Sequence, residues 1–272
     1  MAREDQYFLG QSAAEQERLQ RQAEELARDA NDLFDLIGIN LGSRVVELGC
    51  GPRGCLDLLS QRVGASGSVV GVEINSDAIE LARKYLAEAR IENVEVRQGD
   101  GKATDLPRAS FDMATARLVM VNIPEPERIV AEMVALVKPG GVVALQEADW
   151  GARISEPRLA ALDRLFDVFE TYANRNRMDL FVGRKISRWL KAAGLCDVQV
   201  RPVARVYSLE SPQRTFLLQF AENLRDRIFG EGLISETEFD QSVAALKRHF
   251  ADPEVFFLFP LMIQAWGRKP LQ

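Results

Sequence analysis

Two apolar segments near the start of the chain carry glycines and carboxylates at spacings that suit a nucleotide-like ligand. The first, residues 45–54, runs Val-Val-Glu-Leu-Gly-Cys-Gly-Pro-Arg-Gly, and its three glycines follow the spacing G-x-G-x-x-G. The second, residues 68–73, ends in Glu73. Such a pair predicts two parallel strands joined by a tight turn and a helix. Gly49 and Gly51 let a ligand approach the backbone closely, and Glu73 can accept hydrogen bonds from both hydroxyls of a ribose.

The position of Glu47 narrows the choice of ligand. Glycine spacing alone is typical of a nicotinamide dinucleotide site, but Glu47 stands two residues before the first glycine. A dinucleotide would bring its pyrophosphate close to this position, where a carboxylate repels phosphate and attracts a cation. S-adenosylmethionine has an ammonium and a sulfonium group and no phosphate, so the pattern favours it. A nicotinamide-dependent oxidoreductase remains as an alternative.

Glu47 and the three glycines together resemble the first motif of the class I S-adenosylmethionine-dependent methyltransferases, E-x-G-x-G-x-x-G. Later segments extend the resemblance in chain order. Residues 93–101 end in Gly-Asp-Gly, residues 110–117 match the fourth strand, and Lys-Pro-Gly-Gly at 138–141 turns into the fifth. The match covers residues 44–149. With a loose N-terminal pattern in residues 7–22, the layout is similar to ubiquinone-biosynthesis-like and natural-product small-molecule methyltransferases.

The resemblance implies S-adenosylmethionine as the cofactor and assigns roles to the strand ends. Glu47 is expected to orient the amino group of the cofactor, directly or through a water molecule, while Gly49 and Gly51 pass beside its methionine part. The remaining cofactor-binding residues are Glu73 and Ile74 at the ribose, Asp100 and Gly101 at the adenine, and Arg117, whose backbone is expected at the methionyl end. The alternative is that Glu47, Glu73 and Asp100 are ordinary acidic residues at strand ends or in turns, without a role in binding.

Apolar periodicity predicts an α/β fold in which strands alternate with helices. Strands are expected at residues 44–48, 68–73, 93–98, 111–116, 141–147, 197–208 and 255–266. Helices are expected at 12–37, 54–64, 76–90, 125–138, 157–174, 184–193 and within 212–250. We therefore expect a Rossmann-like, doubly wound, seven-stranded sheet that is mostly parallel, with the last two strands as an antiparallel edge pair. Ligand-binding residues then gather at the carboxyl ends of the parallel strands.

The chain is expected to divide into a short N-terminal part and one large domain. Residues 1–40 are predicted to form a helical lid segment, and residues 41–272 the methyltransferase domain. Helical cap insertions over the cofactor crevice are expected at about 155–183 and 210–252. The aromatic segment at residues 7–9 is expected to bury against the crevice of the same chain or of a neighbour in a homo-oligomer.

Several residues are candidates for the acceptor side of the site. Asp149, at the end of the fifth strand, is the candidate base or orienting group, with a solvent-facing position as its alternative. The candidate substrate-binding residues are Tyr7, Asn122, Trp150, Phe169 and Tyr172. Aromatic residues at helical spacing are more typical of a plain core, and His249 is expected at a surface helix end.

The expected acceptor is a small molecule, such as an aromatic or prenylated metabolite of secondary metabolism. Methylation at carbon, oxygen or nitrogen stays open. The alternative to an enzyme is a module that binds S-adenosylmethionine without catalysis, since fold alone does not settle function.

Composition favours a soluble cytoplasmic protein. The 272 residues carry a formal net charge of −6 and no long basic block, so nucleic acid is not an expected partner. The longest apolar run, residues 255–263, is short and contains a proline, so no membrane partner is expected. Cys50, Cys55 and Cys196 lack zinc-like C-x-x-C spacing, and we expect them to be small buried residues without a metal.

Overall fold

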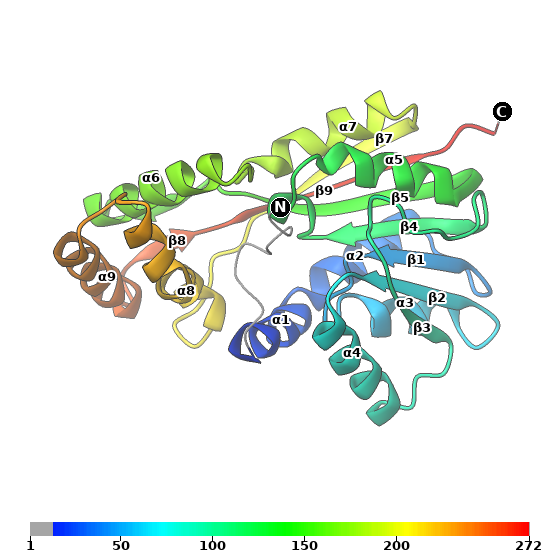
Figure 1. Cartoon of the computed structure of the whole chain (residues 1–272), viewed down its shortest axis with the longest axis horizontal. Helices are drawn as coiled ribbons and strands as arrows, with labels where there is room; N and C mark the ends of the chain where they lie inside the picture. The colour runs from blue at the N-terminus through cyan, green and yellow to red at the C-terminus, as the bar shows by residue number, and fades with distance from the viewer. Residues whose placement is uncertain (1–12, 272) are drawn as a thin grey trace.

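The computed structural model describes residues 13–271, and its centre is a seven-stranded sheet (Figure 1). In chain order the strands are β1 (Arg44–Leu48), β2 (Ser68–Glu73), β3 (Val94–Gln98), β4 (Phe111–Arg117), β5 (Val137–Asp149), β7 (Cys196–Val203) and β9 (Leu261–Arg268). Their order across the sheet is β3-β2-β1-β4-β5-β9-β7. Strands β1 to β5 run parallel, and β9 is antiparallel to both β5 and β7. The predicted fold, including its antiparallel edge pair, is confirmed.

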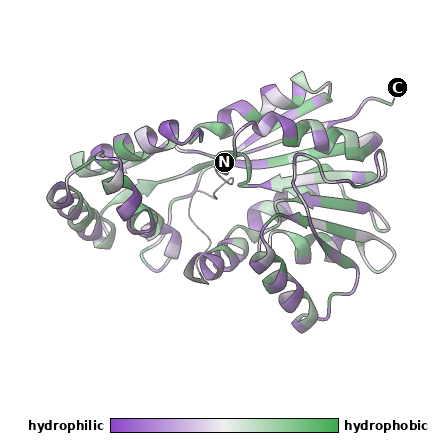
Figure 2. Ribbon diagram, in the orientation of Figure 1, coloured by the Kyte–Doolittle hydropathy of each residue, from purple (hydrophilic) through white to green (hydrophobic). Residues whose placement is uncertain are grey.

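Helices cover both faces of the sheet because successive strand residues point to opposite sides. The helices α2 (Ala27–Ile37), α3 (Leu56–Val63) and α4 (Ser76–Glu88) share one buried apolar cluster with alternate residues of the central strands. The helices α5 (Pro126–Leu136) and α7 (Ile186–Ala192) belong to a second cluster on the other face. Figure 2 shows the strands as mainly apolar ribbons, whereas the helices carry both apolar and polar residues.

Three further helices gather at one end of the molecule, beyond the carboxyl ends of the parallel strands (Figure 1). They are α6 (Ala160–Arg175), α8 (Phe216–Gly230) and α9 (Glu236–Ala251), and we call them the cap. A two-stranded sheet of β6 (Ile154–Glu156) and β8 (Phe256–Leu258) joins them. The cap helices fall within the predicted insertions, and the division into a lid segment and one domain stays a prediction.

Helix α1 (Ala13–Glu25) links the sheet-bearing part of the molecule to the cap. On one side Glu24 accepts a hydrogen bond from Arg53, which lies in the glycine turn after β1. On the other side Glu25 accepts one from Gln213, which lies just before α8. The helix is thus bonded to both regions, the glycine turn and the start of the cap.

Local differences from the predicted elements have physical causes in the chain. The predicted strand 255–266 is divided into β8 and β9, because Pro260 has no N–H to continue a strand ladder. Asn75, just before the predicted helix 76–90, is the N-cap of α4, and its side-chain oxygen accepts a hydrogen bond from the N–H of Ala78 at 2.8 Å. The predicted helix 12–37 is interrupted at Leu26, between α1 and α2.

The cysteines divide into two groups. Cys50 and Cys55 are buried beneath the glycine turn, as expected, whereas Cys196 is exposed. The expectation of a buried Cys196 was therefore wrong: this residue begins the edge strand β7, which has a neighbour on only one side.

Candidate functional site

A single pocket of about 1110 Å³ lies at the carboxyl ends of the parallel strands and extends toward the cap. Seven of the eight predicted cofactor-binding residues line it: Gly49, Gly51, Glu73, Ile74, Asp100, Gly101 and Arg117. They come from the ends of β1, β2, β3 and β4, which lie side by side in the sheet. The pocket is therefore at the place where an open parallel sheet binds its ligands.

Glu73 is fixed at the end of β2 by backbone groups on both sides of the turn. Its Oε2 accepts a hydrogen bond from the N–H of Gly51 at 2.9 Å. Its Oε1 accepts from the N–H groups of Ile74 and Asn75 at 2.8 and 2.9 Å. A carboxylate offers about four lone-pair positions, so these three bonds orient Glu73 and leave it capacity for a ligand hydroxyl.

Asp100 follows β3 in a tight turn on the same side of the pocket. Its Oδ1 accepts a hydrogen bond from the N–H of Lys102 at 2.8 Å, and the side chain is exposed. Gly101 packs against Ile129 of α5, because a Cβ atom added at Gly101 would lie 3.2 Å from that side chain. Among residues 13–271, the second carboxylate oxygen of Asp100 has no hydrogen-bond partner, so the turn presents this oxygen and a close backbone to the pocket.

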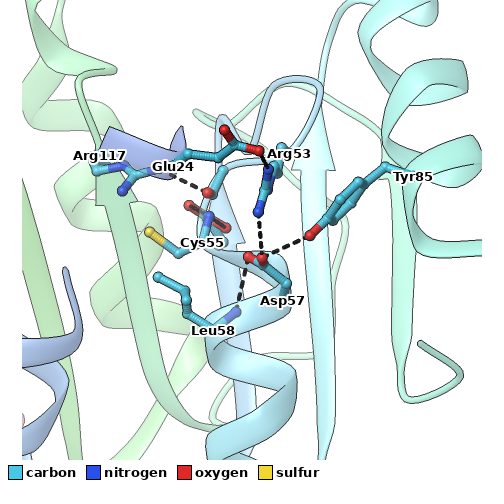
Figure 3. Close-up of polar contacts among 9 residues, drawn as sticks. Glu24, Arg53, Cys55, Asp57, Leu58, Tyr85 and Arg117 are labelled. Carbon is cyan, nitrogen blue, oxygen red and sulfur yellow. Dashed lines mark hydrogen bonds and ion pairs between the residues drawn. The ribbon is translucent and has the colours of Figure 1, made fainter. Parts of the chain in front are cut away.

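The predicted contact of Glu47 with the amino group of the cofactor stays a prediction, and in the structure the side chain binds the backbone. Both carboxylate oxygens accept hydrogen bonds from the N–H of Cys55, at 3.0 and 2.9 Å, and the residue is only 1% exposed. From the other side, Nη2 of Arg117 donates to the carbonyl oxygen of Gly54 at 2.7 Å (Figure 3). These are the two polar groups of one peptide unit. Glu47 and Arg117 thus hold the Gly54–Cys55 peptide between them, and Glu47 does not line the pocket.

Burial raises the pKa of Glu47 to about 7, against the opposing attraction of the Arg117 guanidinium and the hydrogen bonds from Cys55. The folded state therefore favours the protonated form more than the unfolded state does. This contribution to stability is fully present below about pH 4.5, the ordinary pKa, and is lost as the pH rises through about 7.

We predict that Glu47→Gln removes this pH dependence, because the amide does not titrate. The difference in unfolding free energy, wild type minus variant, is expected to fall from pH 5 to pH 7 by on the order of 1 kcal/mol per pH unit. Urea unfolding of both proteins at several pH values measures it. A difference that stays constant over this range would contradict the assignment.

A second polar network, which sequence reasoning missed, ties the glycine turn to three helices. Arg53 donates to Asp57 of α3 at 3.0 Å and to Glu24 of α1. Asp57 also accepts from the hydroxyl of Tyr85 on α4 at 2.8 Å, and the Arg53 guanidinium lies over the ring of Tyr85 (Figure 3). The one available signal was the four-residue spacing of Arg53 and Asp57, which suits an ion pair on a helix.

The two glycines of the turn are required for different reasons. Gly49 and Gly51 both have a left-handed backbone, with φ of +68° and +57°. A Cβ atom added at Gly49 would lie 2.5 Å from Cγ2 of Val119, whereas one added at Gly51 would meet no atom within 4 Å. Gly49 is thus packed against the chain, and Gly51 faces open space in the pocket wall.

We therefore predict that Gly49→Ala destabilises the fold more than Gly51→Ala does. Both changes carry the cost of a left-handed residue, about 1–2 kcal/mol. Gly49→Ala adds a clash with Val119, which we expect to raise its total loss to roughly 3 kcal/mol or more. Urea unfolding of the two variants measures the difference, and equal losses would show that the contact with Val119 is unimportant.

On the acceptor side, three predicted residues line the pocket and one does not. Asn122, Trp150 and Tyr172 are in its wall. Phe169 is not: it is 1% exposed and packs edge-on against Trp150 and Phe220, with ring centroids 6.4 and 4.9 Å away. The prediction of Phe169 as a substrate-binding residue is therefore corrected to a core residue behind the wall. Tyr7 and the proposed homo-oligomer contact of the N-terminal segment lie outside the described residues.

Sequence reasoning missed three aromatic residues of the pocket wall, which are Tyr207, Phe216 and Phe220. Phe216 and Phe220, one turn apart on α8, take positions beside Trp150, with ring centroids 6.0 and 4.7 Å from it. Their four-residue spacing was visible in the sequence, but it is the same spacing that a core helix has. Only the packing of α8 across the pocket shows that these residues line a binding site and do not merely belong to the core.

Asp149 is occupied by a structural ion pair. Its Oδ2 and Oδ1 accept hydrogen bonds from Nε and Nη2 of Arg184, both at 2.6 Å, and Oδ1 also accepts from the N–H of Gly151 at 2.9 Å. The side chain is 3% exposed and is not in the pocket wall. This geometry disfavours the predicted role of Asp149 as a base. His249 lies outside the wall as well, with Nε2 2.8 Å from the Ser155 hydroxyl.

The chain belongs to the methyltransferase domain family, whose model matches residues 39–194, more than half of the sequence. The family uses S-adenosylmethionine, so the resemblance seen in the glycine motif is confirmed. Demethylmenaquinone methyltransferase of Listeria monocytogenes is 25% identical over 141 residues, which are 52% of this chain and 57% of that protein. Phosphatidylethanolamine N-methyltransferase of Cereibacter sphaeroides is 35% identical over 130 residues, 47% of this chain and 61% of that protein.

Solved structures share the fold at low identity. Phosphoethanolamine N-methyltransferase 2 of Haemonchus contortus, in complex with phosphomonomethylethanolamine and S-adenosylhomocysteine, is 19% identical with a TM-score of 0.57. The likeness covers 89% of this chain and 52% of that one. The chain spans about half the length of the first curated relatives that it matches.

Among residues 13–271, no three or more His, Cys, Asp and Glu side chains are grouped to hold a metal ion. In the same range, no helix has both the length and the hydropathy of a membrane span.

Proposed function

We propose that this chain transfers the methyl group of S-adenosylmethionine to a small-molecule acceptor. The observation that carries the proposal is the meeting of the glycine turn, Glu73, Asp100 and Arg117 in the wall of one pocket that continues into the cap. The cofactor side supplies acceptors for ribose and adenine groups. The cap side supplies room for a second molecule.

The residues present fit the amino-acid part of the cofactor. Nη1 of Arg117 is buried and has no hydrogen-bond partner among the described residues, although the residue lines the pocket. A buried guanidinium nitrogen without a partner is costly, and a carboxylate of the ligand would satisfy it. Gly51 leaves open space in the wall of the same pocket, since a Cβ there would meet no atom within 4 Å.

When bound, S-adenosylmethionine would supply an electrophilic methyl carbon on a cationic sulfur: an acceptor electron pair would form a bond to this carbon in line with the C–S bond, which would break and leave its electrons on sulfur. The chain contributes by holding the two partners in line and excluding water. Glu73 and Asp100 fix the nucleoside end. Tyr172, Trp150 and Phe216 form a wall against which the acceptor can lie.

The acceptor that this wall supports best is an aromatic metabolite, including a prenylated one. Flat rings pack well edge-on or offset against Trp150, Phe216 and Phe220. Polar groups of Asn176 and Glu231 also line the pocket and can orient a hydroxyl or carbonyl of the acceptor. A demethylmenaquinone methyltransferase among the relatives is consistent with such an acceptor, and a phosphatidylethanolamine N-methyltransferase is the competing example.

Calorimetry tests the cofactor side. We expect S-adenosylhomocysteine to bind with micromolar affinity and NADH not to compete for it. Glu73→Gln is expected to weaken binding roughly 10- to 150-fold, because hydrogen bonds to a charged group contribute about 1.5–3 kcal/mol. Gly51→Ala is expected to weaken it as well, by filling the open space. Glu80→Gln, a change at an exposed residue of α4, is the matched control and should bind S-adenosylhomocysteine as the wild type does. Binding of NADH instead of S-adenosylhomocysteine would overturn the proposal.

A turnover assay tests the acceptor. The protein is incubated with S-adenosylmethionine and either 1,4-naphthohydroquinone or phosphoethanolamine, and S-adenosylhomocysteine formation is measured. We expect product with the aromatic acceptor, because it can pack on the aromatic wall. Product with phosphoethanolamine alone would reject the aromatic acceptor while keeping the methyl transfer.

A further inference from the structure

We propose that Glu147 is a positioning residue for methyl transfer: its buried carboxyl group fixes the segment Leu118–Asn122, which forms the pocket wall between the glycine turn and the acceptor side. The inference rests on the proposed function. Glu147 lies near the end of β5 and does not itself line the pocket, whereas Leu118, Val119 and Asn122 do. It therefore acts through this segment and does not touch the reacting atoms.

The contacts of Glu147 are directed at the backbone. Its Oε1 accepts hydrogen bonds from the N–H groups of Val119 and Met120, both at 2.9 Å, and the residue is 0% exposed. Burial raises its pKa to about 8, against the opposing effect of the backbone N–H groups of Met120, Val119 and Val121. Near neutral pH the group is thus largely a neutral acid, and a glutamine side chain can replace its accepting oxygen.

The segment needs such an anchor because its conformation is locally unfavourable. Leu118 has a left-handed backbone, with φ of +55°, a conformation that a residue with a Cβ atom adopts only at a cost. The short 3₁₀ helix Met120–Asn122 that follows begins with N–H groups that have no partner within the helix. Glu147 satisfies two N–H groups at this point, and the side-chain amide of Asn122 closes the turn by donating to the Leu118 carbonyl at 2.8 Å.

The anchored segment touches both halves of the site. Val119 packs on the glycine turn, as the 2.5 Å approach of its Cγ2 to an added Cβ at Gly49 shows. Val121, Asn122 and Ile123 continue along the pocket wall. A displacement of the segment would therefore move the cofactor turn relative to the acceptor. Misplacement by about 1 Å can lower a rate on the order of 100-fold.

The experiment compares Glu147→Ala with Glu147→Gln. We expect Glu147→Ala to lower kcat on the order of 100-fold, with 1,4-naphthohydroquinone as the acceptor, and to change KM for this acceptor much less. Glu147→Gln is expected to stay within a few-fold of wild type, because its amide oxygen can accept the same two hydrogen bonds. A kcat for Glu147→Gln as low as that of the alanine variant would overturn the proposal.

Glu132→Ala is the matched control for the loss of a buried carboxylate. Glu132 lies on α5 outside the pocket wall, is 6% exposed and accepts hydrogen bonds from the backbone N–H and the hydroxyl of Thr104 at 3.0 and 2.6 Å. We expect this variant to unfold at a lower temperature but to keep the wild-type kcat. Equal losses of kcat in Glu132→Ala and Glu147→Ala would show that Glu147 contributes to stability in general and has no positioning role.

Amide hydrogen exchange gives a readout that does not depend on turnover. The N–H groups of Val119 and Met120 are expected to exchange faster in Glu147→Ala than in wild type, and to be protected again in Glu147→Gln. Unchanged exchange in the alanine variant would refute the anchor even if the wild-type protein methylates its acceptor. Conversely, faster exchange in a protein that forms no S-adenosylhomocysteine would support the anchor and reject the proposed function.

Discussion

The geometry of the site depends on one peptide unit, between Gly54 and Cys55, which is held from both sides by ionisable side chains, the buried Glu47 and the half-buried Arg117. Glu47 accepts a hydrogen bond from the N–H of this peptide, and Arg117 donates one to its carbonyl. Moving ionisable groups even partly away from water is costly unless their partners are well oriented. Here the shared peptide orients Glu47 and Arg117, and their hydrogen bonds fix the glycine turn at its Gly54 end. The turn then presents the N–H of Gly51 to Glu73, so the same constraint reaches the end of β2.

Under the proposed function, the cofactor side and the acceptor side of the pocket are built in different ways. Neighbouring strand ends supply the cofactor side, so residues such as Glu73 and Asp100 meet because the strands are parallel and adjacent. The acceptor side is built by helices distant in sequence, which meet around Trp150: Tyr172 comes from α6, and Phe216 and Phe220 come from α8. Variation in the cap can change the acceptor wall without disturbing the strand ends.

This division explains which parts could be predicted from the sequence. Strand ends in a parallel sheet are located by local pattern, so the pocket positions of Gly49, Glu73 and Asp100 followed from it. The partners of Asp149 and Glu47 could not be predicted in the same way. Arg184 lies 35 positions from Asp149, and the N–H that Glu47 binds belongs to a turn whose conformation the pattern leaves open. Phe169 and Phe220 have the same helical spacing, and only tertiary packing places one behind the pocket wall and the other in it.

Three acidic side chains near the pocket, Glu47, Glu147 and Asp149, are engaged by the protein itself, which bears on how the proposed transfer is accelerated. Ionised carboxylates beside a sulfonium would stabilise the reactant more than the transition state, in which the positive charge on sulfur is being lost. Burial raises the pKa of Glu47 to about 7 and that of Glu147 to about 8, so both are closer to neutral than ordinary carboxylates. Asp149 is neutralised by Arg184. Under the proposed function, these acids hold the backbone in place without trapping the cationic reactant, and the rate depends on alignment and on exclusion of water.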